Sequence, residues 1–263
     1  MRTNHEIDYR IYGEELQFVE IELDPGETAI AESGAFMMMD NGIEMETIFG
    51  DGSQQQGGGF LGKLMSAGKR LITGESLFMT AFTNNGQGKK KVSFASPYTG
   101  KIIKFDLKEL GGKIIAQKDA FLCSAKGVSI GIEFQRRLGT GIFGGEGFIM
   151  QKLEGDGLAF AHAGGFVVER QLQPGEVLKV DTGCVVAYTP NVDFDIEMVK
   201  GIKNFMFGGE GLFFAKLTGP GHVWLQSLPI SRLAGRIMQY GTYKRKEEGG
   251  VLGGLGNLLD GRE

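Results

Sequence analysis

Residues 176–192, EVLKVDTGCVVAYTPNV, decide the fold, because two other segments of the chain follow the same template. Residues 27–43 read ETAIAESGAFMMMDNGI and residues 112–128 read GKIIAQKDAFLCSAKGV, and the three segments align without a gap. A unit that occurs three times in one chain predicts an architecture but no chemistry. One shared template position is held by Phe36, Phe121 and Val185.

Each copy of the template continues to a Gly-Glu pair that is followed by an apolar run. The glutamate lies 34 positions after the start of the second and third copies and 48 after the start of the first, so the first copy carries 48 − 34 = 14 extra residues. The copies recur after 85 and 64 residues, which is longer than the roughly 20–50 residues of solenoids and propellers. We therefore expect three duplicated strand motifs that form a pseudo-threefold β-barrel or β-prism-like body. The expected repeats are residues 14–100, 101–164 and 165–228.

Alternation of apolar and polar residues predicts strands with one buried face. Residues 192–198 (VDFDIEM) alternate in this way, and residues 43–47 and 128–132 hold the corresponding strands of the other copies. Turn-forming residues precede each of these strands, and later turns predict about four strands per copy. With 44 glycines and short strands, the predicted fold class is all-β, and residues 1–240 are expected to form a single domain.

Two segments depart from the strand pattern. Residues 60–72 place apolar side chains on one helical face and cations on the other, which predicts one short amphipathic helix in the first repeat. Residues 229–240 begin with Pro229 and keep a helical apolar spacing, which predicts a C-terminal helix that packs on the barrel. Residues 241–263 are expected to form a flexible, charged and glycine-rich tail.

Composition limits the classes of partner and the compartment. The 28 basic and 32 acidic residues, with a pI of about 5.6, make nucleic acid an unlikely partner. Cys123 and Cys184 lie in apolar strand patterns, so we expect free thiols and a reducing compartment. The polar start of the chain does not resemble a secretory signal, and no apolar run is long enough to span a membrane. We expect a cytoplasmic protein, with peripheral attachment to a membrane left open.

Several short motifs together resemble one known family. They are the Leu-x-Pro-Gly-Glu openings at 23–27 and 172–176, the run LITGESLF at 71–78 and the run GGEGLF at 208–213. This combination resembles the mitochondrial biogenesis family named for altered inheritance of mitochondria, across residues 5–240. The resemblance implies an all-β body of three duplicated motifs, similar in fold to the trp RNA-binding attenuation protein. It also implies an inner-membrane organising role for eukaryotic members, no assigned function for bacterial members, and no catalytic residues.

Three enzyme-like motifs fail in their context. Residues 127–131 (GVSIG) match a nucleophile elbow, but the serine lies within a predicted strand and not at a strand-to-helix corner. Residues 139–144 match a dinucleotide fingerprint, but a predicted strand follows them where the motif requires a helix. Residues 57–63 resemble a P-loop, but Leu64 stands where that motif requires a serine or threonine to hold magnesium. We therefore predict that the protein is not an enzyme.

The histidines and cysteines do not form a recognisable metal site. The chain contains no His-x-His or Cys-x-x-Cys pair. We therefore predict no cofactor and no identified small molecule, and we expect surface or lining positions for His5, His162 and His222.

The glutamates of the three Gly-Glu pairs are weak candidates for a metal site. A threefold arrangement would place them around one axis, where they could form a carboxylate ring for a cation. The alternative is that each glutamate accepts hydrogen bonds from N–H groups of its own turn. Both interpretations stay open for Glu75, Glu146 and Glu210.

The segments before the three Gly-Glu pairs combine cations, glycines and apolar residues. A shared axis would bring them together as a basic and apolar rim, which suits an anionic membrane surface or a membrane-protein partner. We therefore predict a non-enzymatic scaffold or adaptor that docks through this rim and forms homo-oligomers. The alternatives are self-packing of the apolar residues, or a module that binds a small ligand, a cation or single-stranded RNA. The predicted rim consists of Phe60, Lys63, Leu64, Lys69, Arg70, Arg136, Arg137, Phe143, Lys200, Lys203 and Phe205.

Overall fold

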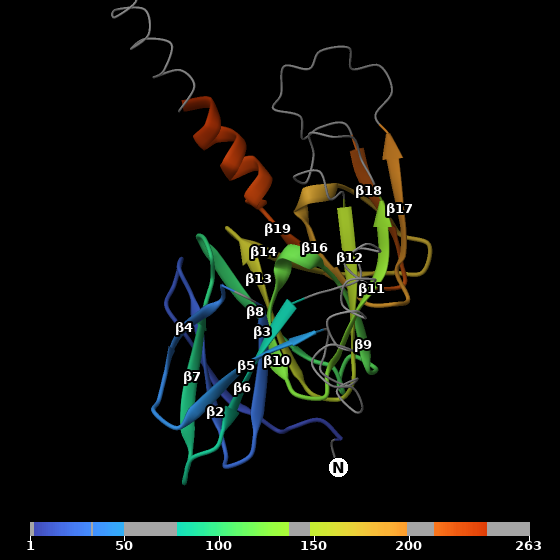
Figure 1. The fold of residues 1–263 in the computed structure, drawn as a ribbon. Coiled ribbons are helices and arrows are strands. Elements are labelled where there is room, and N and C mark those ends of the chain that lie inside the picture. The colour runs from blue at the N-terminus through green and yellow to red at the C-terminus, as the bar shows by residue number, and fades with distance from the viewer. Residues whose placement is uncertain (1–2, 33, 50–77, 137–147, 199–212, 241–263) are drawn as a thin grey trace, which may run out of the picture.

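The computed structural model of the chain describes residues 3–32, 34–49, 78–136, 148–198 and 213–240 (Figure 1). Within these ranges the chain is mostly strand, with a single helix at residues 230–240, as the sequence predicts. The predicted amphipathic helix at 60–72 and the predicted tail at 241–263 lie outside the described residues. Short 3-10 turns are η1 (Lys118–Ala120) and η3 (Thr182–Cys184).

The described strands form four sheets, named A to D, with antiparallel neighbours throughout. In spatial order, sheet A contains β1 (Asp8–Tyr12), β2 (Phe18–Leu23), β7 (Lys90–Ala95) and β4 (Phe36–Met39). Sheet B contains β5 (Ile43–Phe49), β6 (Phe78–Asn84), β3 (Thr28–Glu32), β10 (Phe121–Ala125), β13 (Leu158–Gly164) and β8 (Gly100–Asp106). Sheet C contains β11 (Ser129–Arg136), β12 (Phe148–Glu154), β9 (Lys113–Gln117), β16 (Val185–Tyr188), β19 (Gly221–Gln226) and β14 (Val167–Leu172). Sheet D contains β15 (Val177–Asp181), β18 (Phe213–Thr218) and β17 (Asp193–Met198).

Sheets B and C have the same topology. Each strand of sheet C corresponds to the strand of sheet B whose number is smaller by six, and the corresponding strands follow in the same spatial order. By the same rule, β2-β7-β4 of sheet A corresponds to β8-β13-β10, and β15-β18-β17 of sheet D corresponds to β9-β12-β11. A register shift occurs at the same template position in β4, β10 and β16, directly after Phe36, Phe121 and Val185. The described strands contain no closed barrel, so the pseudo-threefold closure stays a prediction.

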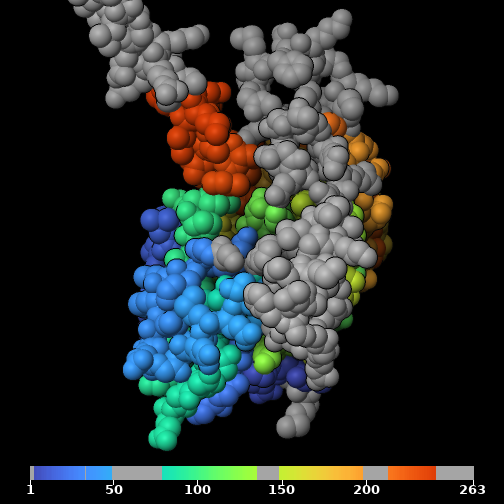
Figure 2. Space-filling model, viewed as in Figure 1, coloured from blue at the N-terminus to red at the C-terminus, as the bar shows by residue number. Residues whose placement is uncertain are grey.

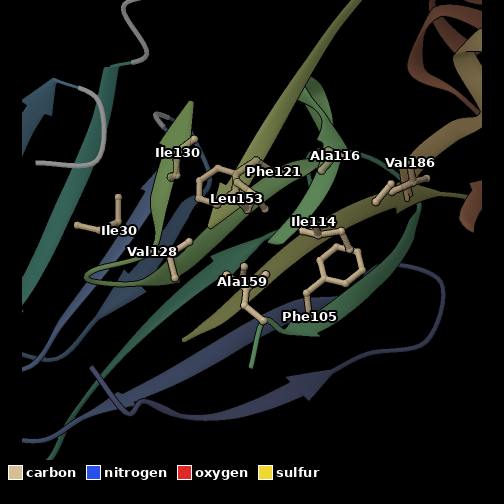
Figure 3. Packing of buried hydrophobic residues seen from close by; sticks show 14 of the residues in the cluster. Ile30, Phe105, Ile114, Ala116, Phe121, Val128, Ile130, Leu153, Ala159 and Val186 are labelled. Atoms are coloured by element: carbon tan, nitrogen blue, oxygen red, sulfur yellow. The ribbon is translucent and has the colours of Figure 1, made fainter. Parts of the chain in front are cut away.

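The four sheets pack in the order A, B, C, D, with one apolar cluster in each of the three spaces between them. The first cluster joins sheets A and B, where Phe94 packs edge-on against Phe82 at a centroid distance of 5.1 Å. The second joins sheets B and C, and Figure 3 shows several of its residues, among them Phe105 and Ile114. In this cluster Phe105 packs edge-on against Trp224 at a centroid distance of 5.1 Å. The third joins sheets C and D around the stacked rings of Tyr188 and Phe194. Burial of apolar surface in three successive layers therefore holds the sheets together.

The first turns of the C-terminal helix contact the body. It begins directly after the buried Pro229, and Arg232 lies 3.7 Å from the carboxylate of Asp181 and 3.8 Å from Cys184 Sγ. Further along, Ile237 is 63% exposed and Tyr240 is 80% exposed. The helix therefore projects away from the sheets (Figure 1), which differs from the prediction that it packs along the body.

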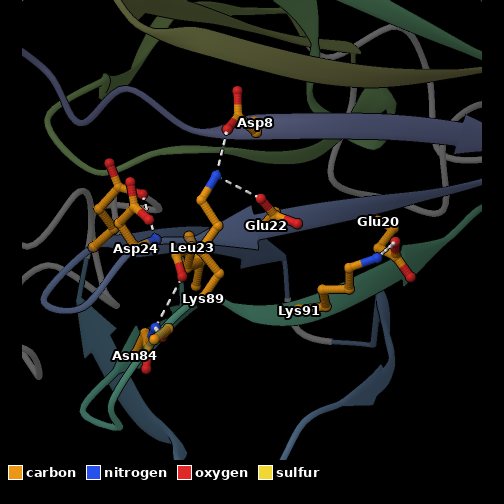
Figure 4. A network of polar contacts seen from close by, with 10 residues as sticks. Asp8, Glu20, Glu22, Leu23, Asp24, Asn84, Lys89 and Lys91 are labelled. Carbon is orange, nitrogen blue, oxygen red and sulfur yellow. Dashed lines mark hydrogen bonds and ion pairs between the residues drawn. The ribbon is translucent and has the colours of Figure 1, made fainter.

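A buried amide connects sheet B to sheet A, and several surface ion pairs connect neighbouring strands of sheet A (Figure 4). The fully buried Asn84 donates hydrogen bonds to the carbonyl oxygens of Leu23 (2.8 Å) and Gly88 (2.9 Å), and its Oδ1 accepts one from the N–H of Gly86 (2.9 Å). By contrast, the ion pair between Lys91 and Glu20, at 2.8 Å, lies at the surface. The amide therefore satisfies the carbonyl group of the buried Leu23, whereas Lys91 stays in contact with water.

We expect Asn84→Ala to lower the free energy of unfolding by about 2–4 kcal/mol, because it leaves two carbonyl groups and one N–H at the sheet A–sheet B junction without their partner. Urea denaturation followed by circular dichroism measures the change. The control Lys91→Ala removes a surface ion pair and is expected to shift the urea midpoint much less. Equal shifts in the two variants would contradict this assignment.

Candidate functional site

The predicted rim falls almost entirely outside the described part of the chain. Arg136 is the exception, because its backbone ends strand β11. Every other rim residue, and each of the three Gly-Glu glutamates, lies in 50–77, 137–147 or 199–212, which are not described. The rim and the carboxylate ring therefore stay predictions.

The ends of the three segments that carry the rim are described. Each segment leaves from and returns to adjacent antiparallel strands, β5 and β6, β11 and β12, or β17 and β18. The last ladder pairs at these three ends are Phe49 with Phe78, Arg136 with Phe148, and Met198 with Phe213. The structure therefore attaches the three cationic segments at equivalent hairpin ends of sheets B, C and D.

A cavity of about 380 Å³ lies where strands β3, β10 and β13 meet the start of the C-terminal helix. Its lining includes Glu32 from the end of β3, Asp119 from η1, His162 from the middle of β13, and Tyr98 and Ile230. A larger cavity of about 530 Å³ is lined mainly by turn residues, among them Pro190 and Pro220. The smaller cavity is the better candidate site because its ionisable groups include the buried His162 and the half-buried Glu32 and Tyr98.

His162 is the most deeply buried of the polar groups in this cavity. Its side chain is 1% exposed, and neither ring nitrogen has a hydrogen-bond partner among the described residues. Its ring meets the Tyr98 ring edge-on at a centroid distance of 4.4 Å. Burial lowers the pKa of His162 to about 4; the Tyr98 backbone opposes this shift, although its geometry falls short of a hydrogen bond. The imidazole is therefore neutral at pH 7.

Glu32 has the opposite titration behaviour. Burial and, to a smaller extent, the negative charge of Asp119 raise the pKa of Glu32 to about 7, while Lys118 acts in the other direction. A carboxyl group with this pKa exchanges its proton near neutral pH. Burial also raises the pKa of Tyr98 to about 12, so the phenol keeps its proton.

The cavity can therefore present a neutral imidazole, a phenol and a titrating carboxyl group to a small polar molecule. In the described ranges, no group of three or more histidine, cysteine or acidic residues is placed to hold a metal ion. His162 lines this cavity, in agreement with the surface or lining position that the sequence predicts, whereas no sequence pattern singles out Glu32, Tyr98 or Asp119. One signal was available, because His162 interrupts the small and apolar run LAFAHAG of β13.

Glu32→Gln should remove a pH-dependent loss of stability. The folded-state pKa of about 7 lies above the unfolded value of 4.5, so the folded state binds the extra proton, and stability falls as the pH rises from about 4.5 to 7. We compare the free energy of unfolding of the variant with that of the natural chain at each pH by urea denaturation. We expect this difference to favour the variant by about 1–3 kcal/mol more at pH 8 than at pH 5. The control Glu46→Gln, on an exposed stretch of β5, should change little between the two pH values. If Glu32→Gln and the natural chain differed in free energy of unfolding by the same amount at pH 5 and pH 8, the assignment would be contradicted.

His162→Gln should remove a loss of stability on the acid side. The folded-state pKa of about 4 lies below the unfolded value of 6.5, so stability is lost as the pH falls through this interval. Glutamine fits this template position, because the aligned Gln226 accepts a hydrogen bond from Gly164 N–H and donates one to the Gly183 carbonyl, each at 2.8 Å. We expect the acid-side loss to shrink by as much as about 3 kcal/mol, measured by urea denaturation at pH 4.5 and 7. If His162→Gln lost as much stability between pH 7 and pH 4.5 as the natural chain does, this account would be refuted. His222→Gln is the control and should keep the loss of the natural chain.

Comparison with known proteins agrees with the all-β architecture. A crystal structure of a Streptococcus pyogenes protein is 24% identical and superimposes with a TM-score of 0.69, covering 89% of this chain and 100% of that chain. An uncharacterized protein of Streptococcus pyogenes serotype M6 is 31% identical over a 227-residue alignment that covers 84% of this chain and 86% of that protein. The model of the family described as mitochondrial biogenesis AIM24 matches residues 9–228. The chain therefore belongs to the mitochondrial biogenesis AIM24 family.

Proposed function

We propose that this protein is a non-enzymatic scaffold that docks on an anionic membrane surface through its three cationic, glycine-rich segments. The observation that carries the proposal is their attachment at equivalent hairpin ends of sheets B, C and D. Three weak contacts that are held on one rigid body bind together more strongly than each binds alone. In this proposal the three copies of the template serve to repeat the docking segment.

The composition of the segments supports a surface that is both charged and apolar. Residues 60–70 contain three cations, and residues 136–143 and 200–205 contain two cations each, next to phenylalanine or leucine. Cations near an anionic leaflet contribute roughly 1 kcal/mol each, and apolar side chains add burial at the headgroup boundary. The chain as a whole has a net charge of −4, so docking requires the cations to be locally concentrated.

Among the described residues, no helix combines the length and the apolar character that spanning a bilayer requires. Attachment at the surface is the form of membrane contact that we propose.

Replacing Lys63, Lys69 and Arg70 by glutamine should weaken vesicle binding at least about tenfold at low salt, because three cations leave the docking segment. Co-sedimentation with phosphatidylcholine vesicles, with and without about one third phosphatidylserine, measures the binding at about 0.05 M and 0.5 M salt. The matched control replaces the exposed Lys104, Lys108 and Lys126 by glutamine, which removes the same charge from elsewhere on the surface.

Three outcomes would contradict the proposal. The first is an equal loss of binding in the segment variant and the control, which would indicate a net-charge effect. The second is absence of binding to the anionic vesicles by the natural chain at low salt. The third is binding that is the same with and without phosphatidylserine, which would exclude the electrostatic part of the mechanism.

A further inference from the structure

Two pairs of strands join successive copies of the template within one sheet. We call each such pairing a seam. The first seam pairs β3 with β10, with Ala31 opposite Cys123 and Ile30 opposite Ser124. The second pairs β9 with β16, with Ala116 opposite Ala187 and Ile115 opposite Tyr188. Both seams are antiparallel, and they have the same register when the strands are aligned on the template.

The chain also carries both halves of a third seam, and the halves are not joined to each other. By the template, β4 corresponds to β10 and β16, and β15 corresponds to β3 and β9. Among the described strands, β4 pairs only with β7 and β15 pairs only with β18. Each strand therefore keeps one edge of backbone N–H and carbonyl groups without a strand partner, an arrangement that favours pairing with another chain.

The two unjoined strands, β4 and β15, are more exposed than their counterparts in the other copies. All residues of β10 and β16 are buried, and so are most residues of β3 and β9. In contrast, all four residues of β4, Phe-Met-Met-Met, are exposed, and Met37 is 48% exposed. In β15, Val177 is also 48% exposed. Four consecutive apolar residues on a free strand edge are unusual for a monomer and indicate a surface that another strand covers.

The two free edges lie far apart in the chain's own fold. Figure 1 shows β4 at one side of the molecule, while β17 and β18 of sheet D, to which β15 belongs, lie at the other side beyond sheets B and C. In the same view, Figure 2 shows the chain's first strands on the outer surface of the β4 side. The packing order A, B, C, D separates the edges by two intervening sheets. Among the described strands, neither edge therefore has a partner within reach in its own chain, which favours a partner from another molecule.

We propose that β4 of one copy pairs antiparallel with β15 of a second copy, which continues the two internal seams between chains. Transfer of the seam register along the template predicts Met38 opposite Val180, Met39 opposite Lys179 and Asp40 opposite Leu178. A second copy of the chain fits the free edge of β4 because it carries β15. The counterparts of β15, which are β3 and β9, already pair in this way with the counterparts of β4, which are β10 and β16. The contact is head-to-tail, so it builds a closed ring if the rotation closes and a filament otherwise. This pairing does not depend on membrane docking.

Cysteine cross-linking between two separately purified variants tests the register. Met38→Cys and Val180→Cys are each made in a Cys184→Ala background, where the remaining Cys123 is fully buried. Opposite residues in antiparallel strands lie about 4.5–5.5 Å apart at Cα, which permits a disulfide. We expect the oxidised mixture to give a covalent dimer, and each variant alone to stay uncross-linked. Val168→Cys, on the exposed edge strand β14, replaces Val180→Cys in the control mixture and should give no dimer.

The variant with both Met38→Cys and Val180→Cys in one chain separates assembly from internal closure. We expect a ladder of covalent multimers on a non-reducing gel. A compact monomer with an internal disulfide would show that the two edges pair within one chain, and would overturn the proposal. Dimers of the Met38→Cys variant alone would show β4 pairing with β4 and would also overturn it, as would an absence of cross-links in the mixture.

A charge pair supplies a second, independent test of the register. Met39→Lys places a lysine opposite Lys179 of the second copy, and like charges on directly opposed strand residues repel. We expect association, measured by sedimentation velocity, to weaken about two- to fivefold, and Lys179→Glu in the same chain to restore it. Met39→Glu is the matched control and should not weaken association. Equal weakening by Met39→Lys and Met39→Glu would contradict the predicted register.

Discussion

Backbone pairing across the seams is the interaction on which the rest of the structure depends. The pairings of β3 with β10 and of β9 with β16 extend sheets B and C from one copy of the template into the next. Seam residues such as Ala31, Ala116 and Ala187 are fully buried, so their backbone groups have no access to water and need each other. Each apolar cluster then packs against a sheet that spans two copies. Sheets B and C are therefore each shared by two copies of the template.

The local structure could be predicted well because each copy carries its own turn and alternation signals. Predicted strands at 43–47, 128–132 and 192–198 correspond to β5, β11 and β17, and Pro229 precedes the helix. The order of strands could not be predicted, because the seams join residues far apart in the chain and the alternation pattern is similar on both sides of a seam. The exposed run of β4 and the buried run of β10 are both apolar, so sequence alone does not distinguish a free edge from an internal strand.

The candidate cavity was harder to predict than the fold. Glu32, Tyr98, Asp119 and His162 come from four separate parts of the chain, and only His162 stands out against an apolar strand. Its aligned partner Gln226 makes two hydrogen bonds where His162 makes none among the described residues. This difference between aligned positions marks the cavity, and it becomes visible only when burial and hydrogen bonding are known.

The most direct measurement is the molar mass of the full chain by multi-angle light scattering over a dilution series. Continuation of the seams between copies predicts a mass that is a multiple of 28.5 kDa and that falls toward one chain only on dilution. A constant mass of 28.5 kDa at every concentration would contradict the account, because β4 and β15 would then stay free edges in solution.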